Sequence, residues 1–220
     1  MENRQTHWNR NSIVTARSNV KVYCSSFHLR SKRYLKLHVK GKNIHMKKNI
    51  VGKRVILRER RKEDAEFYAY WYSQPKIMFQ CGFTEPTTVE QEEKIPDAED
   101  SDWYTITDLN GKIIGETGLL RMWPVWHCTD LSIMIPNPED QGKGYGTEVI
   151  NMMCELAFGK YEMNRIAIGV VGKNVEALNF YKRVGFREEG IQEQGYYYNG
   201  EYSDFVMMRI LRSEWLQRRE

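Results

Sequence analysis

The sequence predicts an α/β fold with a mixed β-sheet, and two observations lead to that prediction. Strand-like segments alternate with helical ones along residues 50–211, so helices are inserted between strands. Asn-Gly dipeptides at 110–111 and 199–200, the commonest signal for a two-residue hairpin, mark sharp reversals of the chain in this region. Inserted helices and hairpins together indicate a sheet that is mixed rather than all-parallel.

The first half of this region is expected to contain four strands and an aromatic helix. Apolar residues alternate in the first strand and shift to helical spacing from Arg61, until residues 79–83 interrupt the pattern. Thr87 or Thr88 is a suitable N-cap for a further helix, because acidic residues fill the turns that follow. The expected strands are 51–59, 103–109, 112–120 and 128–135, and the loop at 122–126 carries Trp123 and Trp126, whose expected role is packing.

The second half is expected to alternate helix and strand before a closing hairpin. Apolar residues recur at helical spacing over 147–158, and an alternating strand follows at 165–171. A second helix runs over 174–184 and ends before Gly185. The hairpin at 199–200 joins the aromatic run 196–198 to a last strand at 202–210.

A glycine-rich run at residues 141–146 is the most informative stretch of the chain. Three glycines within five residues let the backbone curl tightly, and the helix that follows presents unpaired N–H groups and the positive end of its dipole. Such a turn binds phosphate. The run does not match the dinucleotide motif G-x-G-x-x-G, and Thr147-Glu148 replaces the Lys-Ser or Lys-Thr that ends a nucleotide-triphosphate loop.

The run, with its flanking segments, resembles the GNAT superfamily of acyl-CoA-dependent N-acetyltransferases. Gln141, Gly144 and Gly146 match the family's pyrophosphate signature, Gln/Arg-x-x-Gly-x-Gly/Ala. Residues 129–135 resemble its fourth strand, and 174–186 its Asn-x-x-Ala-x-x-x-Tyr…Gly-Phe segment. The resemblance covers roughly residues 50–211 and implies an α+β domain with a mostly antiparallel central sheet flanked by helices. It also implies transfer of an acetyl group from acetyl-CoA to an amine.

The resemblance assigns residues to the binding of acetyl-CoA. The backbone of the glycine run and the Lys143 side chain would bind the pyrophosphate. The end of the preceding strand would pair with the pantetheine arm, and Asn174 would touch that arm from the following helix. The residues expected to bind the co-substrate are Met134, Ile135, Gln141, Gly142, Lys143, Gly144, Tyr145, Gly146, Thr147, Asn174 and Ala177.

Two catalytic roles remain, an acid for the departing thiolate and a base for the attacking amine. Tyr181 lies on one helical stripe with Asn174, and a phenol of pKa near 10 is protonated at neutral pH and can donate to a thiolate. Asp130 is the first candidate for the base, because relatives often carry Glu on this strand. Asp is one methylene shorter, so a bridging water would be required. Glu116 and His127 are the alternatives.

The acceptor is an amine whose identity the sequence leaves open. The spacing of the motifs and the aromatic hairpin resemble the branch that contains ribosomal-protein N-terminal and polyamine acetyltransferases. A polyamine or other small cationic amine, a protein α-amine and an aminoglycoside-like antibiotic are therefore all expected acceptors. A catalytically silent acyl-CoA-sensing module is the remaining alternative. Such relatives frequently dimerise, so the resemblance also leaves a homodimer open.

Acidic residues cluster in the segment 85–102, where Lys94 is the only base. The plain interpretation is a solvated helix face and loop, and the functional one is an acidic wall that attracts a cationic amine. The carboxylates are Glu85, Glu90, Glu92, Glu93, Asp97, Glu99, Asp100 and Asp102.

A basic leader precedes the predicted domain, which we place at residues 47–220. Residues 1–50 hold twelve Lys or Arg and one acid, which leaves a net charge of −7 for residues 51–220 because the whole chain carries +4. The leader, residues 1–46, could be a nucleic-acid-binding arm, a transit peptide, or a disordered or non-native extension before a natural start at Met46. It lacks the apolar stretch of a secretory signal, and no apolar run reaches the length of a membrane span.

Four widely spaced cysteines, Cys24, Cys81, Cys128 and Cys154, form no C-x-x-C pair. This pattern argues against a structural zinc site and against a disulfide framework. Burial is the expected explanation for Cys128 and Cys154. The expected location is the cytoplasm.

Overall fold

A computed structural model describes residues 49–94 and 100–219 of the chain. The predicted leader, its boundary with the domain, and Cys24 lie outside these residues, as do Asp97 and Glu99 of the acidic segment.

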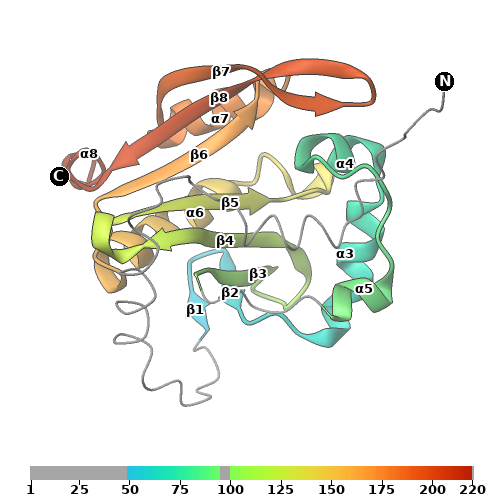
Figure 1. Cartoon of the computed structure of the whole chain (residues 1–220). Coiled ribbons are helices and arrows are strands. Elements are labelled where there is room, and N and C mark those ends of the chain that lie inside the picture. The colour runs from blue at the N-terminus through green and yellow to red at the C-terminus, as the bar shows by residue number, and fades with distance from the viewer. Residues whose placement is uncertain (1–48, 95–99, 220) are drawn as a thin grey trace, which may run out of the picture. The chain divides into compact units, whose positions relative to one another are not determined.

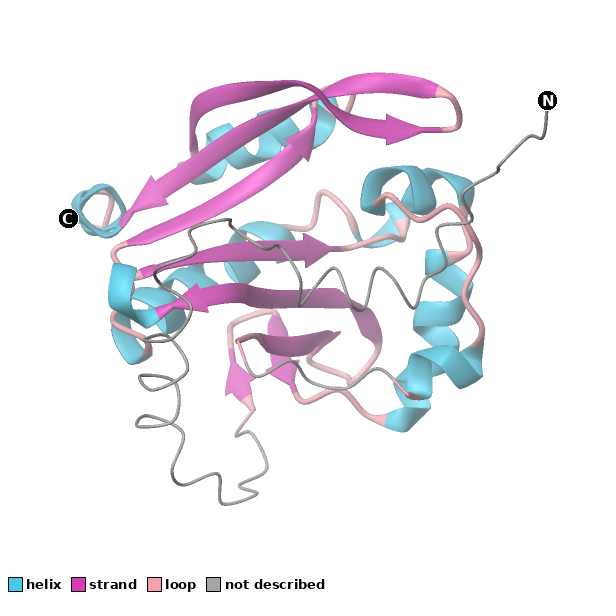
Figure 2. Cartoon of the chain, in the orientation of Figure 1, coloured by secondary structure: helices cyan, strands magenta, loops and turns pink. Residues whose placement is uncertain are grey.

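Within the described residues, eight strands form one sheet in the order β1-β2-β3-β4-β5-β6-β8-β7 (Figures 1 and 2). The pairs are antiparallel except β5 and β6, which are parallel. The prediction of a mixed, mostly antiparallel sheet is therefore confirmed. The strands are β1 (Ile50–Val51), β2 (Val55–Arg58), β3 (Asp102–Asp108), β4 (Ile113–Trp123), β5 (Cys128–Met134), β6 (Arg165–Val171), β7 (Arg187–Tyr198) and β8 (Glu201–Leu211).

The main core lies between the sheet and two amphipathic helices, α6 (Tyr145–Glu155) and α7 (Val175–Val184). The apolar face of α6 packs on strand residues such as Leu57, Leu119 and Leu131, each almost fully buried. The short C-terminal helix α8 (Arg212–Gln217) adds Trp215, whose ring contacts Phe158 at 5.5 Å between centroids. Burial of these apolar side chains holds both helices on one face of the sheet.

The other face is covered at one end by α3 (Ala65–Tyr72), α4 (Pro75–Cys81) and α5 (Val89–Glu93). Tyr68, Tyr72 and Ile77 form a second apolar cluster, against which Met134 packs. Its neighbours Ile133 and Ile135 pack on the main core instead. Because side chains alternate along a strand, the end of β5 contributes to both faces at once.

The structure corrects several predicted bounds. The first predicted strand is two short ones, β1 and β2, joined by a turn at residues 52–54. Residues 79–83 do not simply interrupt a helix, because α4 begins at Pro75, a residue well suited to the first helical position, and ends before Gly82 at φ 73°. α6 begins inside the glycine run, and its last turn, Leu156–Lys160, is a π-helix.

Helix caps explain where the other predicted boundaries fall. Thr88 caps α5, since its side chain accepts a hydrogen bond from the backbone N–H of Gln91, which confirms one of the two predicted caps. Asn174 caps α7, and Gly185 ends that helix at φ 114° as predicted. Trp123 and Trp126 do not pack into the core. They stack on each other, with ring centroids 5.3 Å apart, and remain exposed.

Candidate functional site

The candidate site begins where the two parallel strands separate. β5 pairs with β6 only through Cys128, Thr129 and Asp130, and beyond these residues the strands diverge (Figure 1). β4 and β8 continue to pair with their outer edges. The inner edges therefore form a wedge whose backbone N–H and C=O groups can pair with an inserted amide chain.

At the mouth of the wedge, the glycine run forms the N-terminus of α6. Gly142 and Gly144 have φ of 71° and 83°, a backbone region that favours glycine, and Gly144 is the N-cap. The first hydrogen bond of the helix is donated by Glu148 to the carbonyl of Gly144, so the preceding N–H groups point out of the helix end. This confirms the predicted glycine turn into a helix and gives it the geometry of an anion site.

Two cations lie beside this turn. Lys143 is 3.5 Å from the buried Asp140, whose carboxylate also pairs with Lys112. A Cβ placed on Gly144 would lie 3.2 Å from Nη1 of Arg54, so this guanidinium lies next to the turn. Glu148 accepts hydrogen bonds from the backbone N–H groups of Lys53 and Arg54, which ties the 52–54 turn to the start of α6. Sequence inspection missed Arg54, because the turn that brings it here is 90 residues earlier in the chain.

Contacts around the end of β5 fix its position relative to the glycine run and to β4. The side-chain amide of Gln141 donates to the carbonyl of Ile135 at 2.9 Å, so Gln141 braces the turn. A Cβ on Gly115 would lie 2.0 Å from the Met134 carbonyl oxygen, so only glycine lets β4 come this close. A Cβ added to Gly146 would lie 3.1 Å from the Phe180 ring of α7, so this glycine also allows a close approach. Tyr145 packs on the main core, and Thr147 is exposed.

The α7 residues predicted to bind the co-substrate have structural contacts as well. The Asn174 side-chain oxygen accepts from the Ala177 N–H at 3.2 Å, so this oxygen caps the helix. Ala177 is half-buried against the main core. Contact of either residue with a pantetheine arm stays a prediction.

Tyr181 lies on the buried side of α7. Only 6% of its surface is exposed, and its ring packs against Phe180 and Phe186. The Tyr181 hydroxyl has no hydrogen-bond partner among the described residues, yet it is not one of their fully enclosed polar atoms. Burial, and then the charge of Cys81, raise the pKa of Tyr181 well above its ordinary value, so the hydroxyl keeps its proton.

Glu116 lies on β4 directly opposite Met134, where β5 ends. It is 9% exposed and accepts a hydrogen bond from the Tyr72 hydroxyl of α3. Burial and the charge of Glu116 raise the pKa of Tyr72 far above normal, so Tyr72 acts as the donor. Arg60 Nη1 lies 3.8 Å from a Glu116 carboxylate oxygen, and Arg60 Nη2 pairs with Glu92 at 2.8 Å. A carboxylate is thus held beside the wedge on the face that α3 and α4 border.

The structure does not place Asp130 or His127 beside Met134 at the end of β5. Asp130 lies on the same face as Met134 but four residues earlier on β5, about 13 Å away at the usual rise per residue. Its carboxylate pairs with Arg121 at 2.5 Å, and it is partly exposed. His127 precedes β5, is exposed, and bonds through Nδ1 with the Glu162 carbonyl. The role of Asp130 as base stays a prediction.

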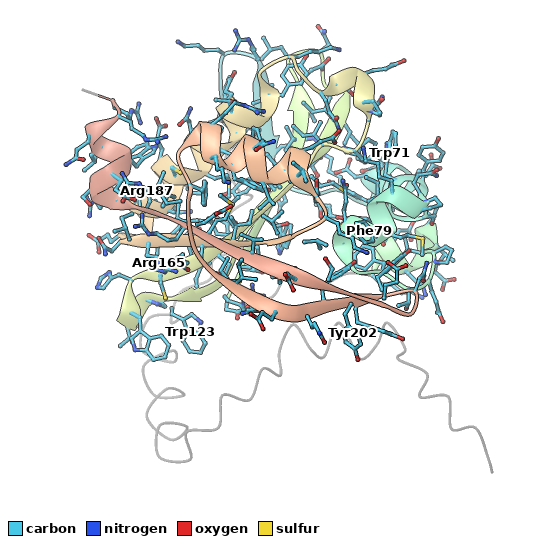
Figure 3. The ribbon with its side chains drawn as sticks, turned by 90° about the horizontal axis from the view of Figure 1, so that it is seen from above. Trp71, Phe79, Trp123, Arg165, Arg187 and Tyr202 are labelled. Atoms are coloured by element: carbon cyan, nitrogen blue, oxygen red, sulfur yellow. The ribbon has the colours of Figure 1, made fainter. Side chains whose placement is uncertain are left out.

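The tip of the β7–β8 hairpin borders the site through contacts with α4. The Tyr196 hydroxyl donates to the carbonyl of Phe79 on α4, and the Phe79 ring lies 5.7 and 5.4 Å from the rings of Tyr196 and Tyr198. Figure 3 shows Phe79 and Tyr202 toward the same end of the sheet, with Trp123 at the opposite end. The predicted aromatic hairpin therefore borders the site through contacts that are far apart in sequence.

Among the described residues, the acidic segment is not a uniformly solvated face. Glu85, Glu90 and Glu93 are exposed, as the plain interpretation predicts. Glu92 and Asp102 are buried instead, Glu92 against Arg60 and Thr87, and Asp102 against Tyr104 and Tyr161. These buried acids serve hydrogen-bond networks, because a buried carboxylate without partners would be costly.

Comparison with known proteins identifies the class that this geometry defines. Residues 54–187 match the acetyltransferase (GNAT) domain family, and the chain belongs to that family. It is therefore an N-acetyltransferase, which confirms the predicted superfamily and the predicted co-substrate, since these enzymes take the acetyl group from acetyl-CoA.

Relatives of known name fall in the predicted branch. The chain is 31% identical over 117 residues to a spermidine N(1)-acetyltransferase of Vibrio cholerae, covering 53% of this chain and 67% of that protein. It is 36% identical over 106 residues to a putative ribosomal N-acetyltransferase of Bacillus subtilis, covering 48% of this chain and 57% of that protein. The matched segment is thus little more than half of the Bacillus relative.

A solved structure supports the same fold. A crystal structure of spermidine N-acetyltransferase from Vibrio cholerae, in complex with CoA and spermine, aligns with a TM-score of 0.68 at 25% identity. The alignment covers 75% of this chain and 99% of that one. Among the described residues, no helix is long and apolar enough to cross a membrane.

Proposed function

We propose that this enzyme transfers the acetyl group of acetyl-CoA to the primary amine of a small cationic acceptor, by direct attack while both substrates are bound. A polyamine is the favoured acceptor. The observation that carries the proposal is the wedge between β5 and β6, with an anion-binding helix end at its mouth and the Tyr181 hydroxyl on α7, which has no hydrogen-bond partner in the part of the chain that the structure describes.

The residues present fit acetyl-CoA at this place. The N–H groups at the start of α6, with Lys143 and Arg54, would bind the pyrophosphate. The inner edge of β5 near Met134 and Ile135 would pair with the amides of the pantetheine arm. Tyr181 would donate its proton to the sulfur as the carbon–sulfur bond of the thioester breaks.

The acceptor would approach from the face bordered by α3, α4 and the hairpin tip. Glu116 is our candidate for removal of the amine proton, directly or through water, because it is buried beside the end of β5 and is oriented by Tyr72. Asp130 would need a longer water relay and would have to leave Arg121. The aromatic rings of Tyr196 and Tyr198 suit an ammonium group, which is attracted to ring faces.

The nature of the relatives supports a polyamine, and one relative supports a second acceptor class. The Vibrio cholerae proteins are named for spermidine acetylation. The Bacillus subtilis relative, named as a putative ribosomal N-acetyltransferase, favours a protein α-amine. A polyamine fits better with a domain of net charge −7 at residues 51–220, since opposite charge steers a polycation to the surface.

A panel of acceptors tests this proposal. We would follow thiol release from acetyl-CoA by the full chain with spermidine, spermine, a ribosomal-protein N-terminal peptide and an aminoglycoside. The expected result is a value of kcat/KM for the polyamines at least about tenfold above that for the peptide, a difference of about 1.4 kcal/mol in transition-state binding. A preference for the peptide would replace the polyamine with a protein acceptor.

Two further expectations belong to this proposal. The cytoplasm is the proposed location, because Cys128 and Cys154 form no disulfide among the described residues, as expected in a reducing compartment. A homodimer stays a prediction, which light scattering of the full chain would test.

A further inference from the structure

Arg60 joins the acid proposed as base to helix α5. It follows β2, and its Nη2 donates at 2.8 Å to the carboxylate of Glu92 and at 3.0 Å to the carbonyl of the same residue. Its Nη1 lies 3.8 Å from a carboxylate oxygen of Glu116. The Arg60 side chain is 22% exposed, and the side chain of Glu92 is fully buried. The guanidinium therefore lies between a carboxylate of α5 and a carboxylate of β4.

Further contacts fix the position of the Arg60 guanidinium. Its central carbon, Cζ, lies 4.0 Å from the centroid of the Tyr68 ring, a cation–π distance. Tyr68 is fully buried, and its hydroxyl bonds with Thr105 at 2.9 Å. Glu92 also accepts a hydrogen bond from the hydroxyl of Thr87 at 2.7 Å. A planar guanidinium held by such partners is oriented before a substrate binds.

Arg60 supplies a positive charge to a cluster of titratable side chains around Glu116. Burial would lower the pKa of Arg60, but its hydrogen bond to Glu92 and the charge of Glu116 raise that pKa overall, so the guanidinium stays charged. Burial and the charge of Glu116 raise the pKa of Tyr68 and of Tyr72 well above normal, so both phenols stay neutral. We define this cluster, drawn from α3, α4, α5, β4 and the segment after β2, as Arg60, Tyr68, Tyr72, Cys81, Glu92 and Glu116.

We propose that Arg60 is a positioning residue for the base: its guanidinium, anchored to α5 through Glu92, holds the Glu116 carboxylate charged beside the end of β5. This inference rests on the proposed function, which takes Glu116 as the base. Burial disfavours the charged form of a carboxylate, whereas a cation within about 4–6 Å favours it. Without the guanidinium, a larger share of Glu116 would be protonated and unable to accept a proton from the amine.

Glu92 keeps this cation from opposing a cationic acceptor. A guanidinium without an acidic partner would repel an ammonium group that approached the base. Glu92 pairs with Arg60 inside the protein, so two carboxylates share one guanidinium and one negative charge is left over. The arrangement therefore charges the base and still attracts an amine in its ammonium form.

The first test follows kcat/KM against pH for the full chain and for Arg60→Gln, with the best acceptor of the panel. We expect the acidic limb of the profile to move upward by about one pH unit or more in Arg60→Gln, because Glu116 then ionises at higher pH. Arg60→Lys keeps the charge and should restore most of that shift. Arg61→Gln is the matched control, since it removes the neighbouring charge from an exposed side chain, and its limb should stay in place.

Two more measurements separate this role from a merely structural one. On a Glu116→Gln background, Arg60→Gln should change kcat/KM by about twofold at most, because Arg60 acts through Glu116. Carbon NMR of labelled glutamate carboxyls follows the titration without turnover, and the Glu116 signal is identified by its loss in Glu116→Gln. Its midpoint should rise by about one pH unit or more in Arg60→Gln.

A paired variant keeps the inference testable if Arg60→Gln folds poorly. Arg60→Gln takes the guanidinium partner from the buried Glu92, whereas Arg60→Gln combined with Glu92→Gln removes both charges and avoids a buried ion without its cation. The paired variant should show the same shift of the acidic limb and of the Glu116 signal.

The outcomes distinguish this inference from the proposed function. An unmoved limb or an unmoved Glu116 signal would overturn the inference, and so would a full further loss of activity on the Glu116→Gln background. If Glu116→Gln loses activity while Arg60→Gln keeps the limb in place, only the role of Arg60 fails. If Glu116→Gln keeps full activity, the choice of base fails, and the inference fails with it. The acceptor panel tests the amine class independently of both.

Discussion

Two side chains on opposite sides of β5 divide the proton transfers of the proposed reaction. Tyr181 comes from α7 on the main-core side, and its raised pKa keeps it protonated at working pH. Glu116 comes from β4 on the other face, where Tyr72 donates to it and Arg60 lies nearby. An acid and a base held apart by a strand cannot neutralise each other, so each can act on its own substrate.

Replacing Glu116 by Gln tests the choice of base. Without a proton acceptor the ammonium form of the amine cannot attack, so we expect kcat/KM at pH 7 to fall by roughly 10²-fold or more. The loss should shrink as pH rises, because the free amine then forms without help. Steady-state rates between pH 6.5 and 9.5 would measure this.

Asp130→Asn is the matched control, since Asp130 lies on the same face but pairs with Arg121. We expect it to change kcat/KM by only a few fold. A large loss in Asp130→Asn with little change in Glu116→Gln would restore Asp130 as the base.

The proposal of Tyr181 as acid has stronger support in the sequence than the proposal of any residue as base. Tyr181 stands in a motif with fixed spacing on one helix, so its neighbours follow from local geometry. The choice between Glu116 and Asp130 depends on strand register, which places Glu116 opposite Met134 at the end of β5. The hairpin between β4 and β5 sets that register. The signal available was a charged residue in the otherwise apolar run Ile114-Gly115-Glu116. Its partners Tyr72 and Arg60 come from elements that no local pattern connects to β4.

At the scale of elements, the glycine turn and α6 form one structural unit. Gly144 caps the helix with a positive φ, Glu148 ties the helix to the 52–54 turn, and Gly146 admits Phe180 of α7. The turn, the helix and the following strand were predictable because each depends on local spacing. The closure of the site by α4 and the hairpin tip was not, since Tyr196 and Phe79 meet only in the folded chain.

Gly144→Ala tests whether this unit binds the co-substrate. An alanine at φ 83° is strained by about 1 kcal/mol, and its Cβ would crowd Arg54. We expect KM for acetyl-CoA to rise several fold while KM for the amine changes little. Initial rates with each substrate varied in turn would show this.

Gly159→Ala provides the comparison, because an added Cβ there meets no atom within 4 Å. That variant should match the parent enzyme in both KM values. Equal effects of the two substitutions would mean that the glycine turn has no special part in binding acetyl-CoA.

At the scale of the whole domain, a polar network on the α3 side holds the sheet and its helices together. Asp64 accepts from both terminal nitrogens of Arg58 at 2.7 Å, from the Arg61 backbone N–H and from Thr105. The Tyr68 hydroxyl bonds with the same threonine at 2.9 Å. The network links β2, α3 and β3 below the site, so loss of it should disturb the position of Tyr72 as well as stability.

Asp64→Asn should destabilise the domain in a pH-dependent way. Burial alone would raise the pKa of Asp64, but hydrogen bonds from Arg58, Arg61 and Thr105 lower it overall from 3.8. Its stabilising effect is therefore present above the unfolded pKa and is lost as pH falls through the folded one. We expect a loss of about 3 kcal/mol at pH 7, since Arg58 would lose its buried partner, and a smaller loss near pH 3.5.

Urea unfolding of the full chain at several pH values would measure that difference. Glu90→Gln is the control, because Glu90 is exposed and pairs only with Lys94 on its own helix. It should leave the unfolding midpoint almost unchanged. A difference between Asp64→Asn and the parent that grows as pH falls would contradict the assigned role of Asp64.

The central claim is that Tyr181 protonates the departing sulfur at the end of the wedge. The most direct measurement is kcat for spermidine acetylation by Tyr181→Phe, with product identified by mass spectrometry and coenzyme A affinity measured by calorimetry. We expect kcat to fall by about 10²- to 10³-fold while the affinity for coenzyme A stays nearly unchanged, because only the hydroxyl is removed. Unchanged kcat would contradict the claim, and so would an equal loss of coenzyme A binding.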